Sequence, residues 1–298
     1  MTTNKEVDQL AKPQRRGSLF FNNLKDFYKR LAKNKTALIG GYLIIFLTII
    51  SIVGPWMTSV DPNLPDYSVK LNGPSADHWF GTDHHGRDIF TRVIHGVGIT
   101  MTIGVLSTIL GGIVGIVIGV ISGYYGGKID TVIMRLMDIL LAFPGILLAL
   151  ALVSILGASR ENVIYAIAIF AVPTFARIVR GSTLSVKNLE YIDAMRALGA
   201  TDIRIIMLHI LPNILSPIIV QASVFIASAV LTASGLSFLG LGEAPPSPEL
   251  GALLSDGRDF MWEAGHIALF PGLVIMVIVL AFNVFGDGLR DALDPKMK

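Results

Sequence analysis

The feature that most constrains this chain is a series of long apolar runs separated by short polar segments. A membrane-spanning helix needs about 20 predominantly apolar residues. The first run, Ala37–Met57, has that length, and similar runs follow at about Ile99–Ser122, Ile133–Leu156, Val163–Val179, Asn213–Ser234 and Ile267–Phe285. The sequence therefore predicts an all-α, polytopic membrane protein with about six transmembrane helices.

The composition agrees with an integral membrane protein. Of the 298 residues, 52% are hydrophobic and only 15% are charged, whereas soluble domains carry about 25% charged residues. The net charge of +2 gives no reason to expect a nucleic-acid partner. Cysteine is absent, which excludes disulfides and thiolate metal ligands.

The charge pattern predicts how the chain crosses the membrane. Residues 1–35 are polar and mainly basic, and lysine and arginine are enriched on the cytoplasmic side of membrane proteins. We therefore expect a cytoplasmic segment (1–35), an uncleaved first transmembrane helix (36–57), a mainly acidic extracytoplasmic loop (58–96), a five-helix core (97–288) and a cytoplasmic tail (289–298). Six spans would leave both termini in the cytoplasm.

One inner loop, residues 183–212, is amphipathic rather than simply polar. Apolar side chains recur at i, i+3, i+4 and i+7, which is one face of a short helix. These side chains are Tyr191, Ala194, Met195 and Leu198. On the other side, Asp193 and Arg196 are spaced to form an ion pair. We expect a helix at the membrane surface whose apolar face needs a partner, although an ordinary interfacial loop helix would show the same periodicity.

The sequence also predicts the ends of this helix and the element that follows it. Asn188 is a suitable N-cap, and Gly199 permits the positive φ that ends a helix. Pro212 fits the first turn of the next helix. A second amphipathic stripe between them repeats the same spacing, at Ile203, Ile206, Met207 and Ile210.

These residues resemble a known family motif. Asp193-Ala194-Met195, three residues, Gly199, nine residues and then His209-Ile210-Leu211-Pro212 is similar to the EAA loop in membrane subunits of bacterial ABC importers. The chain differs at Asp193 for Glu, Met195 for Ala and His209 for Ile. In that family the loop carries a coupling helix that docks into a groove on the ATPase subunit. The resemblance assigns ATPase coupling to Tyr191, Asp193, Ala194, Met195, Leu198 and Gly199.

Two further stretches narrow the resemblance to one subgroup. Both Gly81–Gly96, GTDHHGRDIFTRVIHG, and the segment Gly235–Pro248 resemble the C-type permeases of dipeptide, oligopeptide and nickel importers. The resemblance implies a permease subunit in the cell membrane that translocates a di- or oligopeptide. Nickel, glutathione and opine are alternative solutes. The sequence leaves the residues of the solute pathway open.

The resemblance also implies partners and assigns no chemistry to this chain. The expected partners are a homologous second permease, two cytoplasmic ATPase subunits and an extracytoplasmic solute-binding protein. No catalytic, cofactor-binding or metal residue is expected here, because ATP and Mg²⁺ would be bound by the ATPase subunits. The glycine-rich turn at 123–128 lacks the order of a phosphate-binding loop.

Two rival functions follow from charged residues. An ATPase-independent secondary transporter would use a charge inside the membrane. Arg135 and Asp138 are instead expected near the inner end of the third span, where they should pair with each other or face protein or water, and we favour the pair. A membrane-embedded enzyme could bind metal through His84, His85 and Asp88. For these three residues we favour a glycine-punctuated turn in which aspartate side chains accept bonds from backbone N–H groups.

Small residues and prolines predict features of the core. Glycines spaced by four in the second span form a bare ridge against which another helix can pack, at Gly111, Gly115, Gly119 and Gly123. Pro144 should kink the third span. The small residues of the fifth span suit either tight helix packing or a wide path for a solute.

Overall fold

Long helices account for most of the structure. The computed structural model describes residues 34–58 and 60–293. Within these residues, five helical segments are long and apolar enough to span a membrane: α3 (Lys35–Met57), α4 (Ile89–Tyr125), α7 (Arg160–Lys187), a continuous segment at Asp202–Phe238, and α12 (His266–Leu293). A bent pair, α5 (Gly127–Leu141) and α6 (Gly145–Leu156), makes a sixth span if its arms count as one.

The segment Asp202–Phe238 consists of three elements. They are α9 (Asp202–Ile205), a π-helical turn, η2 (Ile206–Ile210), and α10 (Leu211–Phe238). Throughout the described residues the only extended pairing is an isolated bridge between Thr82 and Asp88. The predicted all-α class with about six spans is therefore confirmed.

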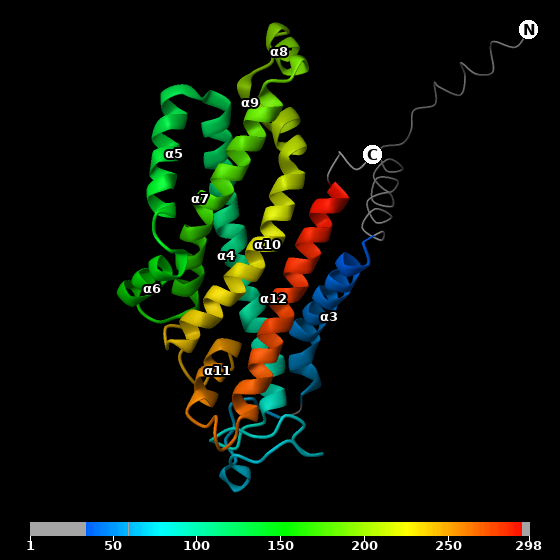
Figure 1. Ribbon diagram of the computed structural model, residues 1–298, viewed down its shortest axis with the longest axis vertical. Helices are drawn as coiled ribbons and strands as arrows, with labels where there is room; N and C mark the ends of the chain where they lie inside the picture. Colours follow the sequence, from blue (N-terminus) through cyan, green and yellow to red (C-terminus); the bar gives the residue numbers. More distant parts are fainter. Residues whose placement is uncertain (1–33, 59, 294–298) are drawn as a thin grey trace, which may run out of the picture.

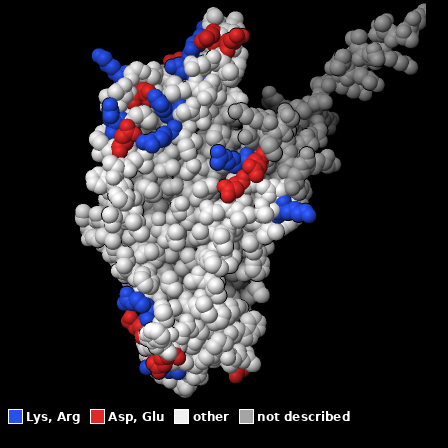
Figure 2. Space-filling view, viewed as in Figure 1, with Lys and Arg blue, Asp and Glu red and all other residues white. Residues whose placement is uncertain are grey.

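The five long spans and α5 run along the long axis of the molecule, and α6 lies across it (Figure 1). The short helix α8 (Glu190–Ala197) lies at one end of this bundle, and α11 (Leu250–Arg258) lies toward the other. On the face shown in Figure 2, charged residues gather toward the two ends, and much of the surface between them is uncharged. This is the distribution expected for a protein that crosses the apolar core of a bilayer.

The predicted glycine ridge is the seam between α4 and α7. A Cβ added at Gly111 would lie 2.4 Å from the carbonyl oxygen of Ala168, and one at Gly119 would lie 2.6 Å from that of Ala176. Only glycine allows so close an approach of the two backbones. The ridge therefore packs one helix on another, as the sequence predicts.

The first and last spans pack together through the same device. A Cβ added at Gly40 of α3 would lie 2.9 Å from the carbonyl oxygen of Ala281 in α12. At their ends, Asn34 donates a hydrogen bond to Asp291 (3.1 Å). This contact joins the two ends of the described chain at one end of the bundle.

The third span differs from the prediction. The sequence predicts a single helix at about Ile133–Leu156 that is kinked at Pro144, but α5 and α6 meet at an angle of 84°. Pro144 has a ψ of 125° and precedes α6 as its N-cap residue. Proline has no N–H to continue the helical ladder and disfavours a helical residue before it. The helix is therefore broken and not merely bent.

The predicted pair of Arg135 and Asp138 is wrong. Asp138 instead accepts a hydrogen bond from Arg177 of α7 (2.7 Å). A second pair, Arg180 with Asp130, is bidentate at 2.9 and 2.5 Å, and Ser122 of α4 also donates to Asp130 (2.5 Å). Charges on α5 thus attach it to its neighbours, since ion pairs inside a membrane protein favour contacts between elements over contacts with lipid.

Several helices begin earlier or end later than the apolar runs indicate. α4 begins at Ile89 and not near Ile99, because Asp88 accepts a hydrogen bond from the N–H of Thr91 (2.7 Å) and caps the helix. α12 continues to Leu293 into the expected tail. The two loops that the sequence predicts to be extracytoplasmic contain η1 (Tyr67–Val69) and α11. Most of the expected basic N-terminal segment, 1–33, and residues 294–298 lie outside the described residues.

Candidate functional site

Helix α8 has one side packed on its own bundle and another exposed. Ile192 is fully buried in a cluster with Val179, Ile205 and Ile210, and Met195 is partly buried against it. By contrast, the predicted coupling residues Tyr191 and Leu198 are 40% and 82% exposed, and Ala194 is exposed as well. The structure therefore divides the predicted apolar face. Met195 faces its own subunit, and the residues left free for a partner are Tyr191, Ala194 and Leu198.

A hydrogen-bonded turn ends α8 at the predicted glycine. The N–H of Gly199 donates to the carbonyl of Arg196 (2.9 Å), and the N–H of Ala200 donates to that of Met195 (3.0 Å). This pair of bonds is the Schellman motif, which requires a positive φ at the residue after the helix. Gly199 has a φ of +82°, as predicted. Nothing lies within 4 Å of a Cβ added there, so the constraint is the backbone angle and not space.

The start of α8 differs from the prediction. Asn188 is the C-cap residue of α7, and α8 begins after Leu189, whose side chain makes no capping bond. The N–H of Leu189 donates to the carbonyl of Val186 (3.2 Å), so the chain turns tightly between the two helices. The connection is too short for Asn188 to serve as the cap of the second helix.

The charged side of α8 forms the predicted pair. Arg196 donates to Asp193 at 3.0 Å, and both side chains are well exposed. A pair in this setting contributes only about 0.2–1 kcal/mol. The guanidinium of Arg196 also lies 5.5 Å from the centre of the Tyr124 ring, a cation–π distance.

Tyr124, at the end of α4, is a functional candidate that the sequence did not reveal. Its hydroxyl donates to Asp202 of α9 (2.6 Å), and Lys187 of α7 donates to its carbonyl. With Arg196 over its ring, this buried side chain contacts both arms of the loop. No local pattern predicts these contacts, because they join residues up to 78 positions apart in the chain.

The second predicted stripe is confirmed for two of its four residues: Ile210 is fully buried and Ile206 packs against the same cluster. It is wrong for Ile203 and Met207, which are 73% and 56% exposed, and it misses Ile205, which is fully buried. The π-helical turn η2 explains this, because it contains one more residue than an α-turn and brings positions five apart to the same side. The predicted position of Pro212 in the first turn of α10 is confirmed.

A single polar residue connects α8 with the transmembrane helix after it. The side-chain amide of Asn213 donates to the carbonyl of His209 (2.6 Å) and to the hydroxyl of Tyr191 (3.3 Å). The rings of Tyr191 and His209 are 6.1 Å apart. Movement of α8 would therefore reach the first turn of α10 directly.

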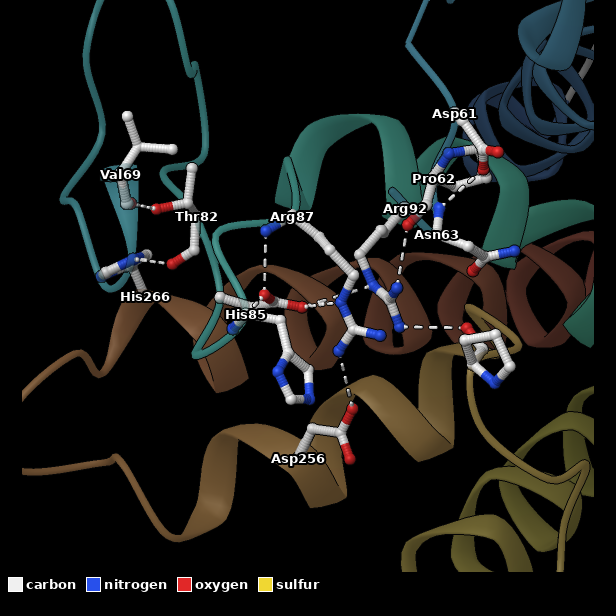
Figure 3. Close-up of polar contacts among 12 residues, drawn as sticks. Asp61, Pro62, Asn63, Val69, Thr82, His85, Arg87, Arg92, Asp256 and His266 are labelled. Atoms are coloured by element: carbon white, nitrogen blue, oxygen red, sulfur yellow. Dashed lines mark hydrogen bonds and ion pairs between the residues drawn. The ribbon is translucent and has the colours of Figure 1, made fainter. Parts of the chain in front are cut away.

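At the opposite end of the molecule, charged residues form a buried cluster (Figure 3). We call Asp83, Arg87, Arg92 and Asp256 the outer cluster. Arg87 binds Asp83 at 2.6 Å and approaches Asp256 of α11 at 3.8 Å, while Arg92 donates to the carbonyl of Pro62 at 2.9 Å. The exposed fractions are 3% for Asp83 and 1% for Arg92. These contacts hold together the loop before α4, α4 itself and α11.

The histidines beside this cluster adopt the turn that the sequence favours. Asp83 accepts hydrogen bonds from the backbone N–H groups of His85 (2.8 Å) and Arg87 (3.0 Å). Asp88 caps α4 and pairs with His78 at 2.9 Å. The structure does not bring His84, His85 and Asp88 together into a metal site, and no group of three metal-binding side chains exists within 34–58 and 60–293.

Two titratable groups near the outer cluster are shifted in opposite directions. Burial, together with the neighbouring His85, lowers the pKa of His84, whose ring stacks 5.0 Å from Phe260. Burial raises the pKa of Glu249, although hydrogen bonds from Ser237 (2.7 Å) partly offset the effect. Both shifts favour the neutral form in a water-poor environment.

Comparison with known proteins gives two family matches. Residues 115–298 match the family described as "Binding-protein-dependent transport system inner membrane component". Residues 22–74 match the "N-terminal TM domain of oligopeptide transport permease C". Together the two matches include every span except the greater part of α4, because residues 75–114 lie in neither match.

Similar proteins align along almost the whole chain. The dipeptide transport system permease protein DppC of Alkalihalophilus pseudofirmus is 50% identical over 274 residues, which cover 92% of this chain and 90% of the relative. The glutathione transport system permease protein GsiD of Escherichia coli O157:H7 is 48% identical with the same coverage.

Solved structures share the fold. A chain of the MetNI methionine ABC transporter in an inward-facing conformation superposes with a TM-score of 0.58 over 69% of this chain and 98% of its own length, at 20% identity. A chain of an amino acid ABC transporter gives 0.52 over 67% of this chain and 94% of its own length, at 15% identity.

Proposed function

This chain belongs to the family of binding-protein-dependent transport system inner membrane components, as an ABC importer permease of the dipeptide and oligopeptide group, and we propose that it carries a short peptide across the cell membrane. The peptide is delivered by an extracytoplasmic solute-binding protein. A homologous second permease completes the channel, and two cytoplasmic ATPase subunits bind and hydrolyse ATP. This chain itself performs no chemistry.

The observation that carries the proposal is the exposed side of α8. Leu198, the C-cap residue of α8, is 82% exposed, and the turn after it is fixed by backbone bonds at Gly199. Helix α8 lies at one end of the bundle (Figure 1). A short rigid helix with an uncovered apolar side is what a groove on a partner recognises. Tyr191, Ala194 and Leu198 would fill that groove, while Asp193 would supply a charge at its rim.

We place the α8 end of the molecule in the cytoplasm. Basic residues of α7 and the coupling loop lie near this end: Arg177, Arg180, Lys187, Arg196 and Arg204. The loops around the outer cluster are acidic. This asymmetry follows the positive-inside rule. The described chain begins and ends toward the α8 end (Figure 1), so both termini would be cytoplasmic.

The peptide is favoured as solute because the two relatives described above are named for a dipeptide and for glutathione, itself a short peptide. Transport would follow alternating access. ATP binding closes the ATPase pair, draws the two α8 helices together and tilts the spans between inward-open and outward-open arrangements.

Reconstitution tests the proposal. Proteoliposomes that contain both permeases and both ATPase subunits should take up a radiolabelled dipeptide only when ATP and the solute-binding protein are supplied. Liposomes with this chain alone should take up none. Dipeptide uptake by the chain alone, without an ATPase, would refute the proposal and favour a secondary transporter.

A further inference from the structure

A polar hollow lies between α7, α10 and α12, and nothing above assigns it a role. Its volume is about 850 Å³, within the range of about 300–1,000 Å³ typical of sites for small molecules. Polar and charged side chains line it together with apolar ones. The polar and charged members are Asn213, Ser216, Gln221, Asp287 and Arg290.

One face of α10 lines this hollow along three turns. The lining positions follow helical spacing, at Asn213, Ser216, Pro217, Val220, Gln221 and Val224. The opposite side of the same turns carries apolar residues such as Leu215 and Ile219, which are 49% and 48% exposed. Polar side chains in spans face protein or water rather than lipid, because lipid offers no hydrogen bonds. The polar face of α10 is therefore turned toward water or the second permease.

Two opposite charges stand at the edge of the hollow on α12. Asp287 and Arg290 are one helical turn apart and both exposed. Within the described residues neither has an ion-pair partner inside 4 Å, whereas the adjacent Asp291 is bonded to Asn34. In Figure 2 a small group of charged atoms interrupts the uncharged surface beside the upper end of α12. An arginine and an aspartate that line the same hollow match a ligand with one carboxylate and one ammonium group.

The hollow is also connected to the coupling helix. Asn213 lines it and donates to the hydroxyl of Tyr191 on α8 (3.3 Å). A shift of α8 on the ATPase would therefore displace a lining residue of the hollow. No other residue described in the lining makes a side-chain hydrogen bond to α8.

We propose that this hollow is the part of the solute path that binds the peptide, and this deepens the proposed function on which it rests. Arg290 binds the terminal carboxylate of the peptide, and Asp287 binds its ammonium group. Gln221 and Ser216 form hydrogen bonds with the peptide amides. The site therefore takes zwitterionic peptides with free ends.

Because this chain contains no cysteine, a cysteine introduced into the hollow is the only thiol of this subunit that a reagent can label. We would place single cysteines by Ser216→Cys and Gln221→Cys in the complete transporter and treat inside-out vesicles with a charged, membrane-impermeant methanethiosulfonate. Ile219→Cys, on the same turns but the opposite side of α10, is the matched control. The first two variants should react at least tenfold faster than the control, because thiolates form in water and not in lipid.

Protection by the solute identifies the ligand. A free dipeptide added to these vesicles should slow labelling of Gln221→Cys and leave Ile219→Cys unchanged. Adding Arg290→Gln should raise the dipeptide concentration for half-protection about tenfold, since a hydrogen bond to a charged group is lost. The amide of the same dipeptide, which lacks the carboxylate, should protect equally with and without Arg290→Gln. Asp291→Asn, one residue further along α12, should leave the half-protection concentrations of both the dipeptide and its amide unchanged.

The outcomes separate this inference from the proposed function. Equal labelling of all three cysteines, or protection unaffected by Arg290→Gln, would overturn the inference even if the complex imports dipeptide with ATP. If the wild-type complex imports no dipeptide in the reconstituted system, the proposed function fails. In that case rapid labelling of Ser216→Cys and Gln221→Cys without protection would show a path for another solute and would overturn the assignment to peptides.

Discussion

The outer cluster and α8 lie at opposite ends of the molecule and differ in how far their charged and apolar side chains are buried. In the outer cluster, Asp83 and Arg92 are 3% and 1% exposed, and their contacts come from segments of the same chain. At α8 the ion pair of Asp193 and Arg196 is exposed, and Leu198 is 82% exposed. The charges of the outer cluster are paired within this subunit, whereas α8 leaves both an ion pair and an apolar side exposed.

The difference, together with the proposed docking of α8 on an ATPase, predicts which residues stabilise the fold and which couple it to a partner. A buried cluster of charges must be satisfied within the chain, because an unpaired buried charge is costly. An exposed apolar side can be left unpaired until a partner covers it. Substitutions in the outer cluster should therefore lower the free energy of unfolding. Substitutions on the exposed side of α8 should lower the transport rate and leave the free energy of unfolding unchanged.

The largest effect is expected from Asp83→Ala. This change removes the carboxylate that binds Arg87 at 2.6 Å and leaves two buried arginines without it. The expected loss of stability is about 3–5 kcal/mol, measured as the thermal unfolding midpoint of the detergent-solubilised complex. Asp259→Ala is the control, because the pair of Asp259 with Arg258 is exposed, and it should shift the midpoint little. Equal shifts of the midpoint in Asp83→Ala and Asp259→Ala would contradict the predicted difference between the buried cluster and the exposed pair.

A second prediction compares the two sides of α8. Ile192→Ala empties a fully buried position and should cost about 2–5 kcal/mol of stability. Leu198→Ala should leave the unfolding midpoint unchanged but weaken copurification of the ATPase subunits. Unfolding scans and subunit stoichiometry measure the two effects. If Leu198→Ala destabilised the chain as much as Ile192→Ala, the exposed side of α8 would be structural.

A third prediction compares two glycines with the same backbone angle. Gly199 has a φ of +82° and Gly240, toward the outer end, has +80°, and neither has atoms within 4 Å of an added Cβ. Valine at either position should cost about 1–2 kcal/mol, the strain of a left-handed residue. Only Gly199→Val should uncouple ATP hydrolysis from uptake. ATPase and uptake rates of purified complexes would show this, and uncoupling by Gly240→Val as well would point to general strain.

The smallest predicted effect concerns pH. The pKa of His84 is lowered from its ordinary value of 6.5 by burial. Its contribution to stability is therefore complete above pH 6.5 and is lost as the pH falls below that value toward the folded-state pKa. The unfolding midpoint of wild type should fall between pH 7 and 5.5 relative to that of His84→Phe, which keeps the stacking on Phe260. The raised pKa of Glu249 makes its own contribution to stability rise as the pH falls. This contribution is the same in wild type and in His84→Phe, so it cancels when the two unfolding midpoints are subtracted. Parallel pH profiles would contradict the assignment.

The sequence predicts those features that depend on local patterns. Apolar length gives the spans, and glycine spacing gives the α4–α7 seam. Gly199 follows from the rule for helix ends, and Asp193 with Arg196 follows from helical spacing. Each of these features is specified by a few neighbouring residues. The exception is the partner of the glycine ridge, because the sequence does not say which helix packs on it.

The sequence fails where contacts between distant segments decide the structure. Tyr124 joins α4 to α9, and Asp138 pairs with Arg177 and not with nearby Arg135. The π-helical turn at 206–210 brings Ile205, which the predicted stripe omits, to the same buried side as Ile210, because an extra residue per turn changes the phase. No periodicity in the sequence specifies such a turn.

The most direct test of the account is to ask which protein touches the exposed side of α8. A photoreactive amino acid placed at Leu198 in the assembled transporter should form a covalent adduct with an ATPase subunit. The same amino acid at Leu239, which is 56% exposed at the outer end of α10, should form none with the ATPase. An adduct between position 198 and the solute-binding protein, or between position 239 and the ATPase, would contradict the claim that α8 is the part of this subunit that the ATPase moves.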